Sequence, residues 1–194
     1  MMTTKVFQRV SAIFLVVAAI FLANCVAYAY MDDYYKSEVT KYTLAIQNNP
    51  NDYDAYIQRG LTYMTLAKYN KAFKDFNSAV AYSERAKKKY FDFLERRGEP
   101  KRFPALSESR LAEAYLGRGA CYFILGDRKK AVQDYTKSIQ SYNSIQNDMF
   151  AQVFEYKEKL AQAYYGRGMA YQALGENAKA QADLAKAKQL ASNG

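Results

Sequence analysis

The chain has 194 residues, with 28 Lys or Arg, 19 Asp or Glu and no His. Half of the residues are apolar and 15% are aromatic, which predicts a packed core and argues against a disordered chain. The lack of His excludes Ser-His and Cys-His nucleophile pairs and most zinc sites, and the sequence contains no glycine-rich phosphate loop. We therefore expect a non-enzymatic protein with no catalytic residue, cofactor or metal ion, and a net charge of +9 that favours acidic partners.

Residues 1–29 have the pattern of an export signal. Lys5 and Arg9 precede an uncharged run over residues 10–30, and two Asp follow it. This charge asymmetry is typical of a segment whose N-terminus stays in the cytoplasm while the following chain is exported.

Three outcomes fit this segment. It can be cleaved after Ala29, in an Ala-Tyr-Ala site, or acquire a lipid at Cys25, or remain as an uncleaved anchor of about 20 apolar residues. Each outcome predicts that the rest of the chain lies outside the cytoplasm, in the periplasm or on the outer face of the membrane.

Apolar residues at helical spacing predict a leading helix over residues 32–49, packed on a pair of helices at about 53–67 and 70–97. The sequence Arg97-Gly98-Glu99-Pro100 ends the last of these. Its expected apolar stripe consists of Ala72, Phe76, Ala79, Ser83, Ala86, Tyr90 and Phe93.

A nine-residue phrase, A-Y-x-x-R-G-x-x-Y, occurs three times, beginning at Ala55, Ala114 and Ala163. Its Tyr, Gly and Tyr are four and three residues apart, so they share one face of a helix. Because Gly inside a helix costs about 0.5–1 kcal/mol relative to Ala, we expect each Gly to allow close approach of a partner helix.

A second pattern follows each copy of the phrase. Each copy of this pattern begins with a Lys-Ala pair, at Lys71, Lys130 or Lys179, and contains an Asp four residues after the Lys. Turn and cap signals such as Gly126-Asp127 separate the two halves, so each unit is predicted to be a helix, a tight turn and a helix. We expect the repeated arginines to be structural, with the guanidinium stacked on the Tyr three residues earlier; anion binding in a groove is the alternative. These arginines are Arg59, Arg118 and Arg167.

The units resemble the tetratricopeptide repeat family, whose first helix carries a large residue, Gly and Tyr, and whose second carries Ala, an aromatic residue and Ala. The resemblance covers about residues 32–192 and implies an all-α, right-handed solenoid of antiparallel helix pairs. A partial unit at 32–52 would precede units at about 53–97, 104–147 and 148–192. Successive units are more than 34 residues apart, so we expect elongated hairpins, with extra helical turns beginning near Met149. The matching residues are Tyr56, Gly60, Tyr63, Ala72, Phe76 and Ala79 in the first unit, Tyr115, Gly119, Tyr122, Ala131 and Tyr135 in the second, and Tyr164, Gly168, Tyr171, Ala180 and Ala187 in the third.

The resemblance also implies a concave groove lined by the first helix of each unit. An apolar groove with Met and aromatic residues suits an amphipathic helix or an extended apolar peptide, and hence a protein partner. The leading helix or a second copy of the chain would be other occupants. The groove residues carried over by position are Ile57, Leu61, Met64, Leu116, Ala120, Phe123, Tyr165 and Met169.

Positive charge gathers between Arg85 and Arg110, where nine Lys or Arg face four acidic residues. This basic patch is either a solvated helix face or a contact for anionic lipid or a wall polymer, while the export signal argues against nucleic acid. The sequence predicts an exported scaffold that holds a protein partner in its groove at the cell envelope, or else a structural envelope protein that uses the patch. The patch consists of Arg85, Lys87, Lys88, Lys89, Arg96, Arg97, Lys101 and Arg102. Cys121 is expected to be inert core, and the oligomeric state is not predicted.

Overall fold

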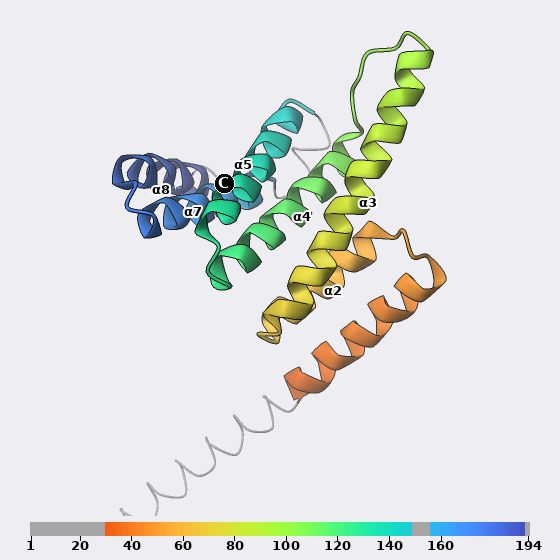
Figure 1. Ribbon diagram of the computed structural model, residues 1–194, viewed down its shortest axis with the longest axis horizontal. Coiled ribbons are helices and arrows are strands. Elements are labelled where there is room, and N and C mark those ends of the chain that lie inside the picture. The colour runs from red at the N-terminus through yellow and green to blue at the C-terminus, as the bar shows by residue number, and fades with distance from the viewer. Residues whose placement is uncertain (1–29, 149–155, 193–194) are drawn as a thin grey trace, which may run out of the picture. The chain divides into compact units, whose positions relative to one another are not determined.

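The computed structural model describes residues 30–148 and 156–192 (Figure 1). The chain divides into two units, residues 1–40 and residues 41–194, which we treat separately. A helix over residues 30–48 continues across this division, close to the range of 32–49 expected from the sequence. None of its residues is buried.

The apolar run of the expected export signal lies mostly outside the described residues. In the part of the chain that the structure describes, no helix has an apolar stretch long enough to cross a bilayer.

The second unit consists of helices that follow one another in pairs, and its described part contains no strand. Within each pair the two helices pack together, and each pair contacts the next. The first helices α2 (Tyr53–Thr65), α4 (Ala105–Ile124) and α7 (Tyr156–Ala173) also contact one another in chain order, so they form one layer. The second helices α3 (Tyr69–Arg96) and α5 (Arg128–Ile145) each pack against the first helix of their own hairpin and that of the next. This is the all-α, solenoid-type arrangement that the sequence predicted. The last hairpin pairs α7 with α8 (Asn177–Ser192).

Each tight turn between paired helices contains a residue in the left-handed conformation, and the predicted cap at Asp127 is present, whereas the first turn of α3 has no side-chain cap. Gly126 and Gly175 adopt positive φ angles of +101° and +78° just past α4 and α7. The first hairpin has no Gly at this position, and Ala67 takes the left-handed conformation there with φ +53°. The side chains of Asp52 and Asp127 accept hydrogen bonds from backbone N–H groups in the first turns of α2 and α5.

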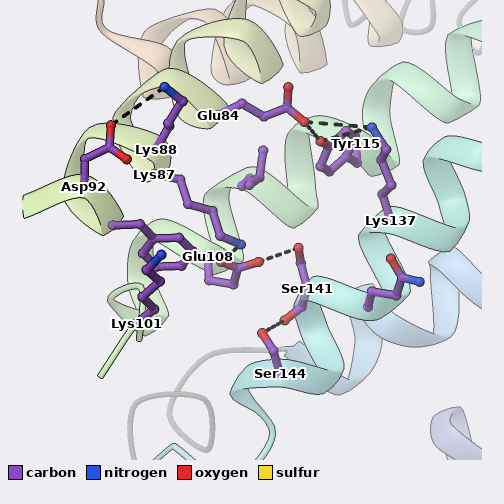
Figure 2. A pocket seen from close by; sticks show the side chains of 13 residues that line it. Glu84, Lys87, Lys88, Asp92, Lys101, Glu108, Tyr115, Lys137, Ser141 and Ser144 are labelled. Atoms are coloured by element: carbon purple, nitrogen blue, oxygen red, sulfur yellow. Dashed lines mark hydrogen bonds and ion pairs between the residues drawn. The ribbon is translucent and has the colours of Figure 1, made fainter. Parts of the chain in front are cut away.

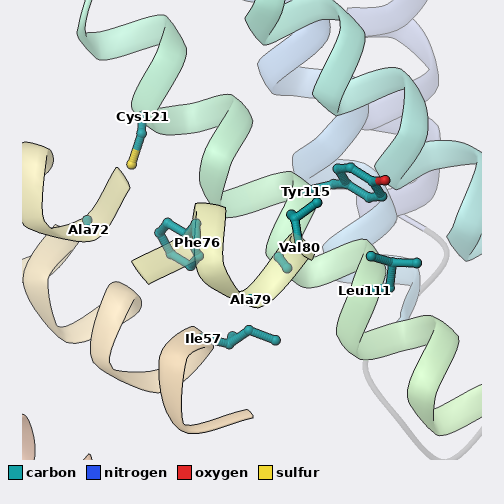
Figure 3. Close-up of a cluster of buried hydrophobic side chains, with 9 residues drawn as sticks. Ile57, Ala72, Phe76, Ala79, Val80, Leu111, Tyr115 and Cys121 are labelled. Atoms are coloured by element: carbon teal, nitrogen blue, oxygen red, sulfur yellow. The ribbon is translucent and has the colours of Figure 1, made fainter. Parts of the chain in front are cut away.

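Aromatic rings on α3 and α5 explain why the repeated phrase contains glycine. A Cβ added at Gly60 would lie 3.0 Å from Phe76 Cε1, and one added at Gly117 in the following unit would lie only 2.4 Å from it. Phe76 is fully buried, among Ala72, Ala79 and other core side chains (Figure 3). The close approach that we predicted is therefore made by a ring, which reaches the first helices of two successive units.

The second hairpin repeats this arrangement. Tyr135 of α5 lies against Gly119 of its own hairpin and Gly166 of the next, where an added Cβ would be 3.1 Å and 2.5 Å from the ring. In the last hairpin the equivalent residue is Leu184, which is only partly buried; a Cβ added at Gly168 would lie 3.0 Å from its Cγ. Each ring thus packs one hairpin on the next.

The apolar stripe expected along α3 is wrong at its far end. Phe93 is 44% exposed, whereas Leu94 is 5% exposed and takes the buried position. At about 100° per residue, Leu94 lies about 20° from the direction of Ser83 around the helix, while Phe93 lies about 80° away. The steps of four and three residues were therefore assigned in the wrong order beyond Ser83.

The connection between α5 and α7 was expected to contain extra helical turns beginning near Met149. Residues 149–155 lie outside the described residues, so this remains a prediction. The described helices end at Ile145 and resume at Tyr156.

Candidate functional site

Each repeated arginine forms a bidentate ion pair with an aspartate on the second helix of its own hairpin. Arg59 donates from Nε and Nη2 to the two carboxylate oxygens of Asp75, both at 2.8 Å. Arg118 pairs with Asp134 at 2.7 and 3.0 Å, and Arg167 pairs with Asp183 at 2.7 and 2.8 Å. We call these three pairs the Arg–Asp clamps.

The same guanidinium groups also reach the second helix of the preceding hairpin. Arg118 Nη1 donates to Asn77 at 3.0 Å, and Arg167 Nη1 donates to Thr136 at 3.1 Å. Arg59 makes the equivalent bond to Thr43, in the helix over residues 30–48. Each clamp therefore joins three helices.

Each guanidinium also stacks on the tyrosine three residues earlier, with centroid distances of 5.7 Å for Arg59 on Tyr56 and 5.6 Å for Arg118 on Tyr115. Arg167 lies 5.4 Å from the ring of Tyr164. The structural interpretation of these arginines was therefore right, because their donors are used inside the fold and not presented to a ligand.

The clamps are buried, and this shapes their electrostatics. Burial alone would lower the pKa of Arg118, but the hydrogen bond and the charge of Asp134 raise that pKa above its ordinary value. Hydrogen bonding to Asp75 and Asp183 likewise raises the pKa values of Arg59 and Arg167. Every guanidinium nitrogen and every carboxylate oxygen of the clamps has a hydrogen-bond partner, which offsets the cost of removing these charges from water.

Sequence reasoning missed the aspartates of the clamps, although a signal was present. The distance from Arg to Asp is 16 residues in all three units, as the three bonds show. A constant distance between opposite charges, inside units of unequal length, indicates a contact within the hairpin.

Side chains of α2, α4 and α7 surround an apolar cavity of about 380 Å³. Seven of the eight expected groove residues line it: Leu61, Met64, Leu116, Ala120, Phe123, Tyr165 and Met169. The sequence did not predict that the core rings Phe76 and Tyr135, next to Gly117 and Gly166, would form part of the wall. We call this cavity the apolar groove.

Ile57, the eighth expected residue, does not line the groove. Its side chain is fully buried in a core cluster that also contains Val80, Leu111 and Tyr115 (Figure 3). The reason is that α4 begins more than one turn before the repeated phrase, and its extra turns bring Leu111 into the cluster with Ile57.

Charged side chains connect the first helices at one end of the groove. Glu113, on the groove wall, pairs with Arg110 at 3.1 Å and with Lys159 of α7 at 3.2 Å. Arg110 also contacts Asp54 of α2 at 3.1 Å, and burial raises the pKa of Asp54. The groove is therefore polar at this end and apolar along the rest of its length.

Cys121 lies in the core, fully buried, with its Sγ 3.5 Å from Met64 Sδ. Burial raises the pKa of its thiol to about 12, so the thiolate is scarce near neutral pH. This agrees with the expectation of an inert core residue.

The basic patch separates into paired and unpaired cations. Four exposed members have carboxylate partners: Lys88 with Asp92, Arg97 with Glu99, Lys101 with Glu95 and Arg102 with Asp148. A fifth member, Lys87, points inward and pairs with the buried Glu108 at 2.6 Å. Of the eight cations in the basic patch, five therefore have a carboxylate partner within the described residues.

A second cavity, of about 600 Å³, lies between α3, α4 and α5, and several charged side chains line it (Figure 2). Figure 2 shows Lys87 and Ser141 converging on Glu108, with Ser141 Oγ donating at 2.5 Å. At the other side of the cavity Tyr115 donates to Glu84, and burial raises the pKa of Tyr115. Its charged groups pair mainly with one another or with neighbouring side chains, as Glu113 and Lys159 of the apolar groove do, but more charged residues line this cavity than line the groove.

Comparison with known proteins agrees with this geometry. A model of the tetratricopeptide repeat matches residues 53–85, 112–144 and 161–193, about half of the chain. No curated protein sequence matches the chain.

Among solved structures, BtubC (BKLC) from P. vanneervenii is similar at 18% identity and a TM-score of 0.56, over 80% of this chain and 57% of that one. The present chain thus spans less than two thirds of the length of BtubC. MamA is similar at 17% identity, with a TM-score of 0.39 over 82% of this chain and 90% of that one.

Each matched stretch covers most of one hairpin and contains the glycine of the repeated phrase together with the side chain that packs on it, Phe76, Tyr135 or Leu184. The chain belongs to the tetratricopeptide repeat family.

Proposed function

We propose that this protein is an exported, non-enzymatic scaffold that holds a protein or peptide partner in the apolar groove at the cell envelope. Membership of the tetratricopeptide repeat family supports protein–protein interaction in general. The single observation that carries the finer proposal is the wall of the groove, where Leu, Met, Phe and Tyr side chains from three hairpins converge.

The chemistry of the groove favours apolar side chains of the partner. Met64 and Met169 are flexible and polarizable, so they can adapt to side chains of different shape. Glu113 and Lys159 already neutralise each other at the polar end. A partner that inserts two or three large apolar residues would bury them without leaving a charge unpaired, as an amphipathic helix or an apolar peptide does.

A paired substitution tests the groove. The double variant Leu61→Glu and Phe123→Glu places two charges in the wall, and we expect it to lose the partners that the wild-type chain captures in cells. The matched control is Ile124→Glu with Leu125→Glu, because these residues are 44% and 47% exposed and do not line the groove. Helicity and the thermal midpoint of each variant establish that it is folded.

Photo-crosslinking identifies the partner directly. Tyr165 lines the groove and is 56% exposed, so a photoreactive phenylalanine analogue at this position should crosslink to whatever occupies it. The same analogue at Leu125 serves as the control. Identical crosslinked proteins at the two positions, or full capture by the groove double variant, would contradict the proposal.

The export part of the proposal is supported by the order of basic, apolar and acidic residues before residue 34. Mass spectrometry of the tagged protein from cells reads the N-terminus and distinguishes cleavage after Ala29, lipid at Cys25 and the intact anchor. Recovery of the intact, unprocessed chain from the cytosol would contradict export.

A further inference from the structure

Three cations of the basic patch have no carboxylate partner among residues 30–148 and 156–192. They are Arg85, Lys89 and Arg96, all exposed on α3. The other five members of the patch are paired with acidic side chains. The free charge of the patch is therefore concentrated in one helix.

These cations share one face of α3 with an exposed aromatic ring. Counting from Arg85, Lys89 is four residues on and Arg96 eleven, so the three cations lie within about 40° of one another around the helix. Phe93, eight residues on, lies about 80° from Arg85 at the edge of this face, and Asp92, which pairs with Lys88, lies on the face itself. The buried residues Ser83 and Leu94 lie about 200° around the helix from Arg85 and Arg96, respectively. The three cations therefore point away from the core and Phe93 lies at their side; we call Arg85, Lys89, Phe93 and Arg96 the α3 stripe.

Phe93 is the unusual member of the α3 stripe. Its ring is 44% exposed, and the guanidinium of Arg97 lies 5.3 Å from its centroid. A ring between free cations contributes nothing to the core, where Leu94 takes the buried position. Cations beside an exposed aromatic residue match the boundary between lipid head groups and acyl chains, where charge and an apolar ring are both accommodated.

We propose that the α3 stripe binds an anionic lipid surface. Arg85, Lys89 and Arg96 contact head-group phosphates, and the Phe93 ring enters the interface between them. Charge complementarity and the exposed ring favour lipid over a soluble polyanion, because a polyanion in water would use the cations and leave the ring without a role. The α3 stripe shares no residue with the apolar groove, so this inference does not depend on the proposed function.

The absence of Trp from the sequence provides a direct probe. In the full chain, Phe93→Trp creates a single tryptophan on the α3 stripe, and Tyr165→Trp creates a matched reporter in the groove. With vesicles of phosphatidylcholine and phosphatidylglycerol we expect a blue shift of the tryptophan emission in the Phe93→Trp variant and none in the control. Vesicles of phosphatidylcholine alone should leave both spectra unchanged.

Charge removal tests the same surface by vesicle sedimentation. The triple variant Arg85→Gln, Lys89→Gln and Arg96→Gln should weaken anionic-vesicle binding on the order of a hundredfold, from about fivefold per cation. The control triple variant Lys129→Gln, Lys157→Gln and Lys188→Gln removes the same charge from exposed positions elsewhere and should retain most of the binding. Binding of the wild-type chain should also fall as salt rises.

Two results would overturn the proposal. One is an equal loss in the two triple variants, which would mean that net charge alone drives the binding. The other is an unshifted emission spectrum of the Phe93→Trp variant, which would leave a soluble polyanion, such as a wall polymer, as the occupant. The groove variant Leu61→Glu with Phe123→Glu should bind vesicles normally, so the two proposals can fail separately.

Discussion

The Arg–Asp clamps and the α3 stripe use the same kinds of side chain in opposite ways. In the clamps, the arginine recurs in every hairpin, its side chain is 14–17% exposed, and its donors are consumed within the fold. In the α3 stripe, the cations occur in one hairpin, point away from the core and have no described partner. The comparison teaches that repetition at a constant distance from an acid indicates a structural charge, whereas a charge confined to one unit is available for a surface role.

The largest expected effect comes from breaking a clamp. Asp134→Ala leaves Arg118 buried without its carboxylate, and we expect a loss of about 3–5 kcal/mol in the free energy of unfolding. Removing both charges with Arg118→Met and Asp134→Ala should cost less, because no uncompensated charge remains. Urea unfolding of the two variants measures the difference. A loss below about 1 kcal/mol for Asp134→Ala would show that the clamp is not a stability device.

Filling the space beside a core ring should be the next most costly change. A Cβ at Gly117 would lie 2.4 Å from Phe76, so Gly117→Ala should destabilise by about 1–3 kcal/mol despite the better helix propensity of Ala. In a Phe76→Leu background the same substitution should be tolerated better. A double-mutant cycle by urea unfolding gives the coupling energy between the two positions. A value near zero would mean that the cost of Gly117→Ala does not come from contact with the Phe76 ring.

Lys87 lies within the basic patch of the sequence, but in the structure it pairs with the buried Glu108. Lys87→Met leaves Glu108 with the hydroxyl of Ser141, and we expect a loss of about 1–2 kcal/mol in the free energy of unfolding. The control is Lys101→Met, because Lys101 pairs with Glu95 and both of these side chains are exposed. Equal effects of the two changes in thermal unfolding would mean that the burial of Glu108 has no energetic consequence.

The smallest effect on stability is expected for the α3 stripe. The triple variant Arg85→Gln, Lys89→Gln and Arg96→Gln should change the free energy of unfolding by at most about 0.5 kcal/mol per site, because the side chains are exposed and have no described partner. Chemical denaturation measures this alongside vesicle binding. A large loss would mean that these cations serve the fold, and the distinction from the clamps would disappear.

Much of the fold could be read from the sequence because its signals are local. The repeated Tyr, Gly and Tyr, the left-handed glycines Gly126 and Gly175, and the cap at Asp127 depend on residues within one or two helical turns. These local signals predicted the hairpins and the Arg–Tyr stacking, and the Arg–Asp distance of 16 residues was present but not interpreted. Seven of the eight groove positions followed from the resemblance to the tetratricopeptide repeat family, carried over position by position.

What the sequence by itself determined, then, is the repeating unit of two helices and a tight turn, since helical periodicity and turn chemistry are properties of neighbouring residues. The tertiary structure decided which members of that pattern remain accessible. Ile57 became core because Leu111 of another hairpin joins its cluster, and Lys87 turned inward because Glu108, 21 residues away, is buried beside it. Burial and charge pairing depend on contacts between segments distant along the chain, and only the packed arrangement of hairpins brings those segments together.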